Sequence, residues 1–193
     1  MGDGSEAALA VIAFANTHAD GGGGVEQFAD ADGLRTWLRS TGRQVTGAVT
    51  DADAAEARQL RDAVVTILLT HSADPNVSAV AIEESEALLR RAADRYPLRA
   101  TIDRDGVELR PIADGVSAVL AAILAAVTEL AYTGSWSRLK ACRNPPCHFA
   151  FYDRTRNTSA AYCSNACSSQ VSMRAIRARR RAQATDADAD TQS

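Results

Sequence analysis

Apolar residues recur at helical spacing through most of the first 134 residues. The clearest stripe consists of Ala57, Leu60, Val64, Ile67 and Leu68. Because residues three and four apart share one face of a helix, this stripe predicts a helix from Asp51 to about His71, and shorter stripes predict helices over residues 6–15, 32–38 and 77–93. Pro111 should begin a further helix that ends near Tyr132 and is apolar on nearly every side, as a central core helix is.

One segment departs from the helical pattern. In residues 98–110, apolar and polar side chains alternate on both sides of the turn dipeptide Asp105-Gly106. Alternation around a central turn predicts a β-hairpin. The first part of the chain, residues 1–134, is therefore expected to be a mainly α-helical domain with one β-hairpin.

All the cysteines lie beyond residue 140, in two close pairs formed by Cys142, Cys147, Cys163 and Cys167. The spacings C-x4-C and C-x3-C bring two thiolates from each of two local turns to one tetrahedral site, so we predict a structural zinc ion, Zn2+. His148 could replace a ligand, but four cysteines already complete a closed site. Two disulfides or unrelated buried thiols are the alternatives; no secretory signal is evident, and the redox motif C-x-x-C is absent.

The cysteine-rich segment predicts a small domain of its own. Residues 149–151 and 160–162 are expected to form two short strands with a turn over residues 153–159, and residues 164–183, which contain no glycine or proline, should form a helix. This order is that of a treble-clef-like zinc finger over residues 135–183, which makes the fold class of the whole chain α+β. Residues 184–193 should form a disordered acidic tail.

Charge divides the chain at nearly the same place, since residues 1–137 carry a net charge of −9 and residues 138–181 carry +9. The polar groups that the basic segment offers in its predicted turn and helix are Arg154, Arg156, Asn157, Arg174, Arg177, Arg179, Arg180 and Arg181. Guanidinium groups donate hydrogen bonds in a planar fork that suits phosphates and guanine edges. A zinc-pinned basic module of this kind predicts binding to duplex DNA, with a solvated helix face as the alternative.

The pattern C-x4-C-x3-F-Y-D-R-T-R-N, followed by a second cysteine pair and an arginine-rich helix, resembles the CGNR zinc finger. The Cys-Gly-Asn-Arg signature of that family is here Cys167-Ser168-Ser169-Gln170, so only the cysteine is retained. The family is associated with bacterial transcription regulators and commonly carries an N-terminal ABATE domain, a stress-linked ligand-sensing module.

The ABATE resemblance extends to Phe14-Ala15-Asn16-Thr17, which is similar to an F-x-N-T element. It implies a ligand-binding role for Asn16, Thr17, Arg58 and Arg61. Capping or turn formation is the alternative for Asn16 and Thr17. Surface salt bridges are the alternative for Arg58 and Arg61, which we expect on the polar side of their helix.

The leading functional hypothesis is a cytoplasmic DNA-binding transcription regulator that senses an unknown small molecule. The competing hypothesis is a protein-interaction adaptor that uses the finger for docking without binding nucleic acid. No enzyme is expected, because no Ser/His/Asp arrangement or H-E-x-x-H motif occurs and four thiolates leave zinc no open position. No membrane association is expected either, since the uncharged run before Glu129 is too short to span a bilayer. A homodimer is left open.

Overall fold

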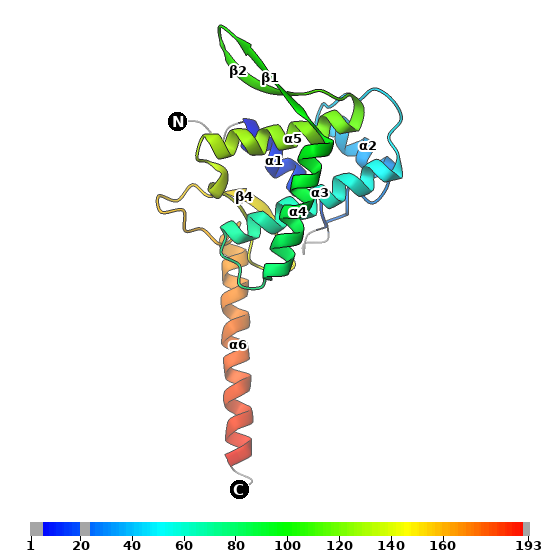
Figure 1. The fold of residues 1–193 in the computed structure, drawn as a ribbon. Coiled ribbons are helices and arrows are strands. Elements are labelled where there is room, and N and C mark those ends of the chain that lie inside the picture. The colour runs from blue at the N-terminus through cyan, green and yellow to red at the C-terminus, as the bar shows by residue number, and fades with distance from the viewer. Residues whose placement is uncertain (1–5, 20–23, 191–193) are drawn as a thin grey trace.

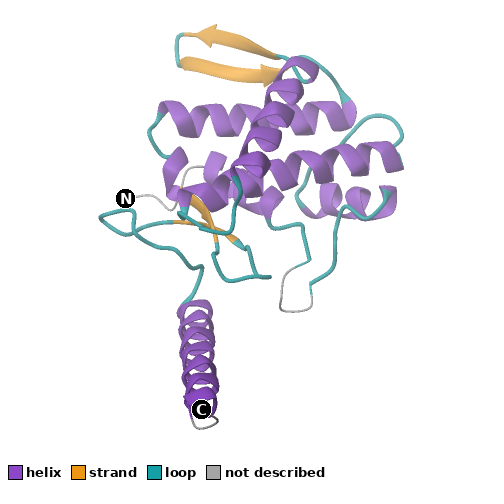
Figure 2. Cartoon of the chain, turned by 60° about the horizontal axis from the view of Figure 1, so that its bottom comes forward, coloured by secondary structure: helices purple, strands orange, loops and turns teal. Residues whose placement is uncertain are grey.

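The computed structural model describes residues 6–19 and 24–190, with side chains described up to Gln183. The first part of the chain contains α1 (Glu6–Ala15), α2 (Ala31–Ser40), α3 (Asp51–His71), α4 (Ala79–Arg95), β1 (Leu98–Asp103), β2 (Gly106–Pro111) and α5 (Gly115–Tyr132). It is followed by the 3-10 helix η1 (Trp136–Arg138), β3 (Leu139–Ala141), β4 (Ala150–Tyr152) and α6 (Asn165–Asp190). Figure 1 shows α6 projecting from the body formed by α1 to α5, and the β1–β2 hairpin lies on the opposite side of that body (Figure 2).

The bounds of α3 confirm the helix predicted from its apolar stripe. A capping box begins it: the side chain of Thr50 accepts from the backbone of Asp53, and the Asp53 carboxylate accepts from the Thr50 N–H at 2.8 Å. Two buried clusters form on its sides. The first contains the aromatic rings of Phe14, Phe28 and Trp37, whose centroids lie 5.2–6.0 Å apart.

The second cluster runs across the predicted domain boundary at residue 134. It joins Val11 of α1 and Leu68 of α3 to Leu139 of β3 and Ala150 of β4, all at most 1% exposed. The zinc-finger hairpin therefore completes the core of the helical body. This continuity determines how the two parts of the chain can influence each other.

The β1–β2 hairpin forms where the alternating pattern placed it, with Leu98 opposite Pro111. Pro111 is consequently the last residue of β2, and α5 begins at Gly115, not at Pro111 as expected. Among the described residues, α5 is the one helix long and apolar enough to cross a membrane by length and composition. Its Leu120, Ile123 and Leu130 are buried inside the fold, as expected of a core helix.

The strand pairing in the finger differs from the prediction. β4 pairs antiparallel with β3, so that Leu139 lies opposite Tyr152, and residues 160–162 form no strand. The pattern of apolar residues predicted no strand at residues 139–141, but this segment forms β3 because Leu139 and Ala141 are buried in the second cluster. The last helix also continues to Asp190, where a disordered tail was expected. Residues 191–193 lie outside the described part.

Candidate metal centre and nucleic-acid surface

The four cysteine thiols gather where the β3–β4 hairpin meets the start of α6. Cys142 and Cys147 lie in the connection between the strands, Cys163 precedes α6, and Cys167 lies in its first turn. Their sulfur atoms all lie within 4.8 Å of one another. The Sγ atom of Cys163 is 3.7 Å from that of Cys147 and 3.7 Å from that of Cys167. A zinc tetrahedron with Zn–S bonds of about 2.3 Å has sulfurs about 3.8 Å apart, so the cluster fits structural zinc.

The cluster forms a closed site, because four thiolates fill the tetrahedral coordination of zinc. His148 does not belong to the metal-binding group that the described residues form. Zinc in such a site supplies cross-linking and charge neutralisation, and no position is left for a reacting water.

Without a bound metal ion, the thiols of Cys147 and Cys167 have different pKa values. Burial raises the pKa of Cys147 to about 11, and the negative charge of Cys142 acts in the same direction. Burial would also raise the pKa of Cys167, but hydrogen bonds from Asn144 and Ser164 lower it to about 7. Because zinc binds thiolates, metal binding releases protons at neutral pH and becomes tighter as pH rises.

Asn144 connects α6 to the zinc turn, which is the segment 142–147 that holds the first two cysteines. Its buried side chain donates from Nδ2 to Oε1 of Gln170 at 2.9 Å, and its Oδ1 accepts from Nη2 of Arg174. The Nη1 of Arg174 also donates to the carbonyl of Pro145 at 3.0 Å. Gln170 occupies the position of the arginine in the CGNR signature. Through these hydrogen bonds, Gln170 and Arg174 hold α6 against the zinc turn. Arg174, expected at the nucleic-acid surface, thus makes contacts within the protein.

A buried ion pair organises the loop between β4 and α6. The side chains of Lys140 and Asp153 are 4% and 0% exposed, and Nζ of Lys140 lies 2.8 Å from Oδ2 of Asp153. Lys140 also donates to the carbonyls of Thr158 (2.6 Å) and Ala160 (2.9 Å), so each ammonium proton has an acceptor. Sequence reasoning missed this pair, although Asp153 is the only acid in residues 138–181.

The Asp153 carboxylate accepts further hydrogen bonds, from Thr155 and from the N–H of Ala160. Burial would raise the pKa of Asp153, but the hydrogen bonds from Lys140, Thr155 and Ala160 lower it to about 2. A carboxyl with a depressed folded-state pKa stabilises the fold above its unfolded value of about 3.9. That contribution is lost as the pH falls toward 2. The loop is therefore held firmly at neutral pH.

This loop displays three of the predicted nucleic-acid contacts. Arg154, Arg156 and Asn157 are exposed on it. Arg138 braces the loop from η1, because its Nη1 donates to the carbonyls of Asp153 and Thr155, each at 3.0 Å. The basic side chains therefore stand on a defined scaffold and not on a long flexible turn.

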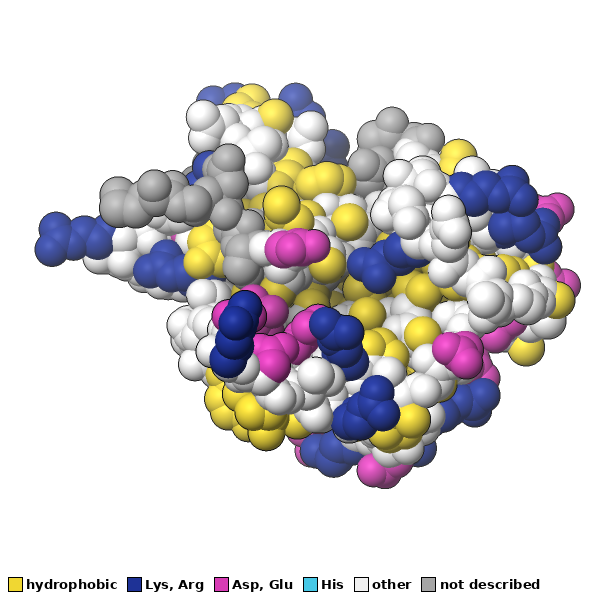
Figure 3. Space-filling view, turned by 90° about the horizontal axis from the view of Figure 1, so that it is seen from above, with side chains coloured by type: hydrophobic (Ala, Val, Ile, Leu, Met, Phe, Trp, Pro, Cys, Tyr) yellow, Lys and Arg dark blue, Asp and Glu magenta, His cyan; other side chains and the backbone are white. Residues whose placement is uncertain are grey.

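The remaining predicted nucleic-acid contacts lie on the projecting part of α6, and their side chains are exposed. They are Arg177, Arg179, Arg180 and Arg181. Met173 and Ile176 are 49% and 39% exposed on the same helix. The face of the molecule opposite α6 has a different character, because acidic and basic side chains are scattered there around apolar patches (Figure 3).

Asn16 joins the helical body to the finger. Its Oδ1 accepts from the N–H of Ala150 at 2.6 Å, and its Nδ2 donates to the carbonyl of the same residue at 3.0 Å. The Asn16 amide thereby pairs with the backbone of β4 much as a neighbouring strand would. This contact of Asn16 is neither a helix cap nor a turn, because it links two residues that are far apart in the sequence.

The other three predicted ligand-binding residues also make internal contacts. Arg61, expected on the polar side of α3, is instead buried at 2% exposure; its Nη1 donates to Glu26 at 2.6 Å and lies 3.4 Å from the Thr17 hydroxyl. Asp62 accepts from Nε and Nη2 of Arg61 at 2.9 and 2.8 Å. Arg58 donates to the carbonyl of Phe28 at 2.6 Å. These contacts hold the segment before α2 against α3, and a ligand role for the residues stays a prediction.

Two family models match the chain. The ABATE model, described as a putative stress-induced transcription regulator, matches residues 9–134. The model of the CGNR zinc finger matches residues 138–180. No curated protein matches the chain. The two matched segments meet at η1, where the helical body passes into β3.

Proposed function

The chain belongs to the ABATE family and carries a CGNR zinc finger, and from this premise we propose that the finger binds duplex DNA while the helical body senses a small molecule. The protein is a transcription regulator by family, and DNA binding gives that role a direct mechanism. Such a regulator acts where the chromosome is, which in a bacterium is the cytoplasm.

The observation that carries the DNA-binding proposal is the projection of α6 with its exposed arginines. Arg177 and Arg181 are four residues apart and follow Arg174 on one helical face. Arg174 fixes that face relative to the zinc turn. Guanidinium groups spaced along one face of a helix can contact successive phosphates.

Protein docking is the second candidate function, and one observation favours it. Met173 and Ile176 are exposed large apolar residues on a helix that contacts little of the body. Exposed apolar side chains on such a helix suit a hydrophobic groove of a partner protein. The absence of Gly-Asn-Arg after Cys167 points in the same direction.

We further propose that the protein is not an enzyme. The closed cysteine site offers no open metal position, and the charged groups of the Lys140–Asp153 and Arg61–Glu26 pairs are satisfied by each other and by the backbone. Their arrangement suits structural support and not proton transfer to a substrate.

DNA binding is tested by titrating zinc-loaded protein with random duplex DNA over a salt series. Each phosphate that a cation neutralises contributes about 0.9 to the slope of log affinity against log salt. The variant Arg177→Gln/Arg181→Gln should therefore bind more weakly at low salt, with a slope flatter by about 1–2. Glutamine retains good helix propensity, so the change removes charge without disturbing α6.

The matched control is Arg91→Gln/Arg99→Gln, which removes the same charge from exposed positions on the helical body. It should leave the slope nearly unchanged if the finger makes the phosphate contacts. Equal effects of the two variants would show a diffuse attraction and contradict the proposal. Absence of DNA binding by the wild type at low salt would favour protein docking through Met173 and Ile176.

A further inference from the structure

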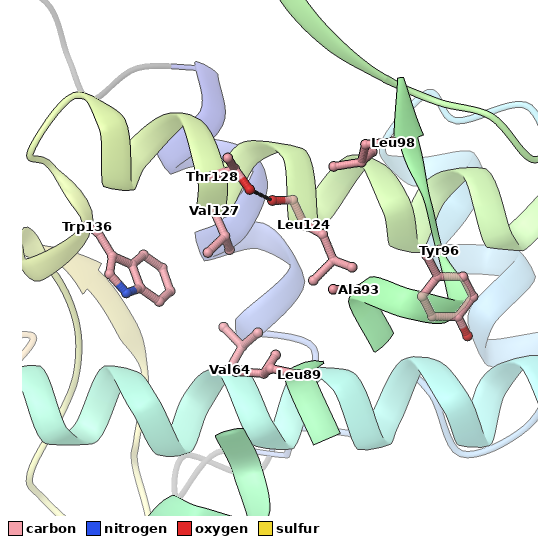
Figure 4. Close-up of a pocket in the computed structure, with 9 residues that line it drawn as sticks. All are labelled: Val64, Leu89, Ala93, Tyr96, Leu98, Leu124, Val127, Thr128 and Trp136. Carbon is pink, nitrogen blue, oxygen red and sulfur yellow. Dashed lines mark hydrogen bonds between the residues drawn. The ribbon is translucent and has the colours of Figure 1, made fainter. Parts of the chain in front are cut away.

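A cavity of about 300 Å³ lies between the helical body and the start of the finger. Residues from α3, α4, β1, α5 and η1 line it, and Figure 4 shows Trp136 and Tyr96 at its two ends. Val64 and Leu89 form one wall, and Leu124 and Val127 form part of another (Figure 4). None of the predicted ligand-binding residues takes part in this lining.

The chemistry of the lining selects for an uncharged ligand. The nine lining residues include no charged side chain. The Thr128 hydroxyl donates to the carbonyl of Leu124 at 2.8 Å, and the Tyr96 hydroxyl donates to Glu56 at 2.6 Å, so both hydroxyls already have acceptors. A charged ligand would lose its hydration here without gaining a partner. An apolar cavity of about 150 Å³ holds benzene, so this one suits a molecule of two fused rings.

The cavity is also connected to the finger through one of its walls. The Trp136 ring lies edge-on to the His71 ring, with centroids 5.1 Å apart. His71 donates from Nδ1 to the carbonyl of Leu139 at 2.8 Å, since a carbonyl can only accept. Leu139 begins β3, which leads directly to Cys142. A ligand against Trp136 therefore touches the segment that positions the first zinc ligand.

We infer that this cavity is the effector site, and that its ligand is a small, uncharged, largely apolar molecule the size of a bicyclic aromatic. The assignment of the cavity as an effector site rests on the proposed regulator function, whereas the ligand class rests on the cavity alone. Binding would be driven by burial of apolar surface against Trp136, Tyr96 and the aliphatic walls.

The test uses the full-length, zinc-loaded protein and 2-naphthol, which is uncharged at neutral pH, in a calorimetric titration. The wild type should bind one equivalent, and 2-naphthoate, which has the same rings and a negative charge, should not displace it. Ala93→Phe places a ring into the cavity from an exposed position on α4 and should weaken binding by at least about tenfold. Ala79→Phe makes the same change on α4 away from the cavity and should bind 2-naphthol as the wild type does.

Should circular dichroism show that Ala93→Phe has lost its fold, Val127→Phe fills the cavity from the opposite helix. Equal binding by the wild type and a folded filled variant, or displacement by 2-naphthoate, overturns the assignment. The DNA titration separates this result from the regulator function. If the protein binds DNA but not 2-naphthol, the cavity assignment fails and the regulator function stands. If the protein binds 2-naphthol but not DNA, the cavity remains a ligand site and loses its role as an effector site.

Discussion

The helical body and the zinc finger are stabilised by different means. The body buries aromatic and aliphatic side chains in two clusters around α3, and its polar interior is limited to a few contacts such as the Arg61–Glu26 pair. The finger buries little apolar surface beyond its hairpin, and it is held instead by the four-cysteine cluster, of which Cys142 is buried, and by the buried Lys140–Asp153 pair. A segment of this size cannot build a sufficient apolar core, so metal and charge take its place.

The difference teaches where each part is vulnerable. Apolar burial in the body is spread over many residues, so no single side chain of the body supplies most of it. The interior of the finger depends on groups that must all be present, because an unpartnered charge or a missing ligand leaves its partners buried and unsatisfied. The two parts are nevertheless joined through Leu139, Ala141 and Ala150 in the second cluster.

Removal of zinc should have the largest effect. The variant Cys147→Ser removes a partly buried ligand, and structural zinc contributes about 10–16 kcal/mol of apparent binding free energy at neutral pH. We expect loss of bound zinc and unfolding of residues 138–164, with a lower melting temperature for the body because the second cluster loses its β3 and β4 members. Metal analysis and thermal unfolding followed by circular dichroism measure both changes.

Most of the helical signal should survive in that variant, because the first cluster contains no residue of the finger. Chelation of zinc from the wild type serves as the independent comparison and should give the same unfolding curve. A zinc-free protein whose body melts at an unchanged temperature would show that the β3 and β4 residues of the second cluster do not stabilise the body.

One ion pair in each region allows a matched test of the same chemical change: the buried Lys140–Asp153 pair of the finger and the Arg61–Glu26 pair of the body, in which only Arg61 is buried. Asp153→Asn leaves Lys140 buried without a counter-ion and should lower the free energy of unfolding by about 3–5 kcal/mol. Glu26→Gln in the body should cost only about 1 kcal/mol, since Arg61 keeps Asp62 and the Glu26 side chain is partly exposed. Urea denaturation at constant zinc saturation measures both, and equal costs would contradict the contrast between the regions.

The sequence predicted the elements that have a local signature. The stripe of α3, the alternation around Asp105-Gly106 and the paired cysteines each depend on neighbouring residues, and the structure contains all three features. β3 was missed because its three residues carry no periodicity, and only the second cluster explains why Leu139 is buried. The burial of Arg61 was missed for a similar reason, since an arginine on an amphipathic helix is normally exposed.

The contact of Asn16 with β4 tests whether the two regions are coupled at all. Asn16→Ala removes both hydrogen bonds to Ala150 and leaves its buried N–H and carbonyl without these partners, which should cost about 2 kcal/mol in the zinc-loaded protein. The cost should largely vanish in the Cys147→Ser background, because β4 is then unfolded and the contact is already lost. Urea denaturation of the single and double variants gives the coupling free energy as a double-mutant cycle.

Asn76→Ala is the matched control, because the Nδ2 of Asn76 donates to the Asp74 carboxylate at 2.8 Å within a turn of the body. Its cost should be the same with and without zinc. If Asn16→Ala behaves like Asn76→Ala, the helical body and the finger unfold independently, and a ligand in the body would need some route other than the β4 contact to influence the finger. If the cost of Asn16→Ala depends on zinc, then by reciprocity the state of the body alters the stability of the finger by the same free energy, as regulation of DNA binding from the body requires.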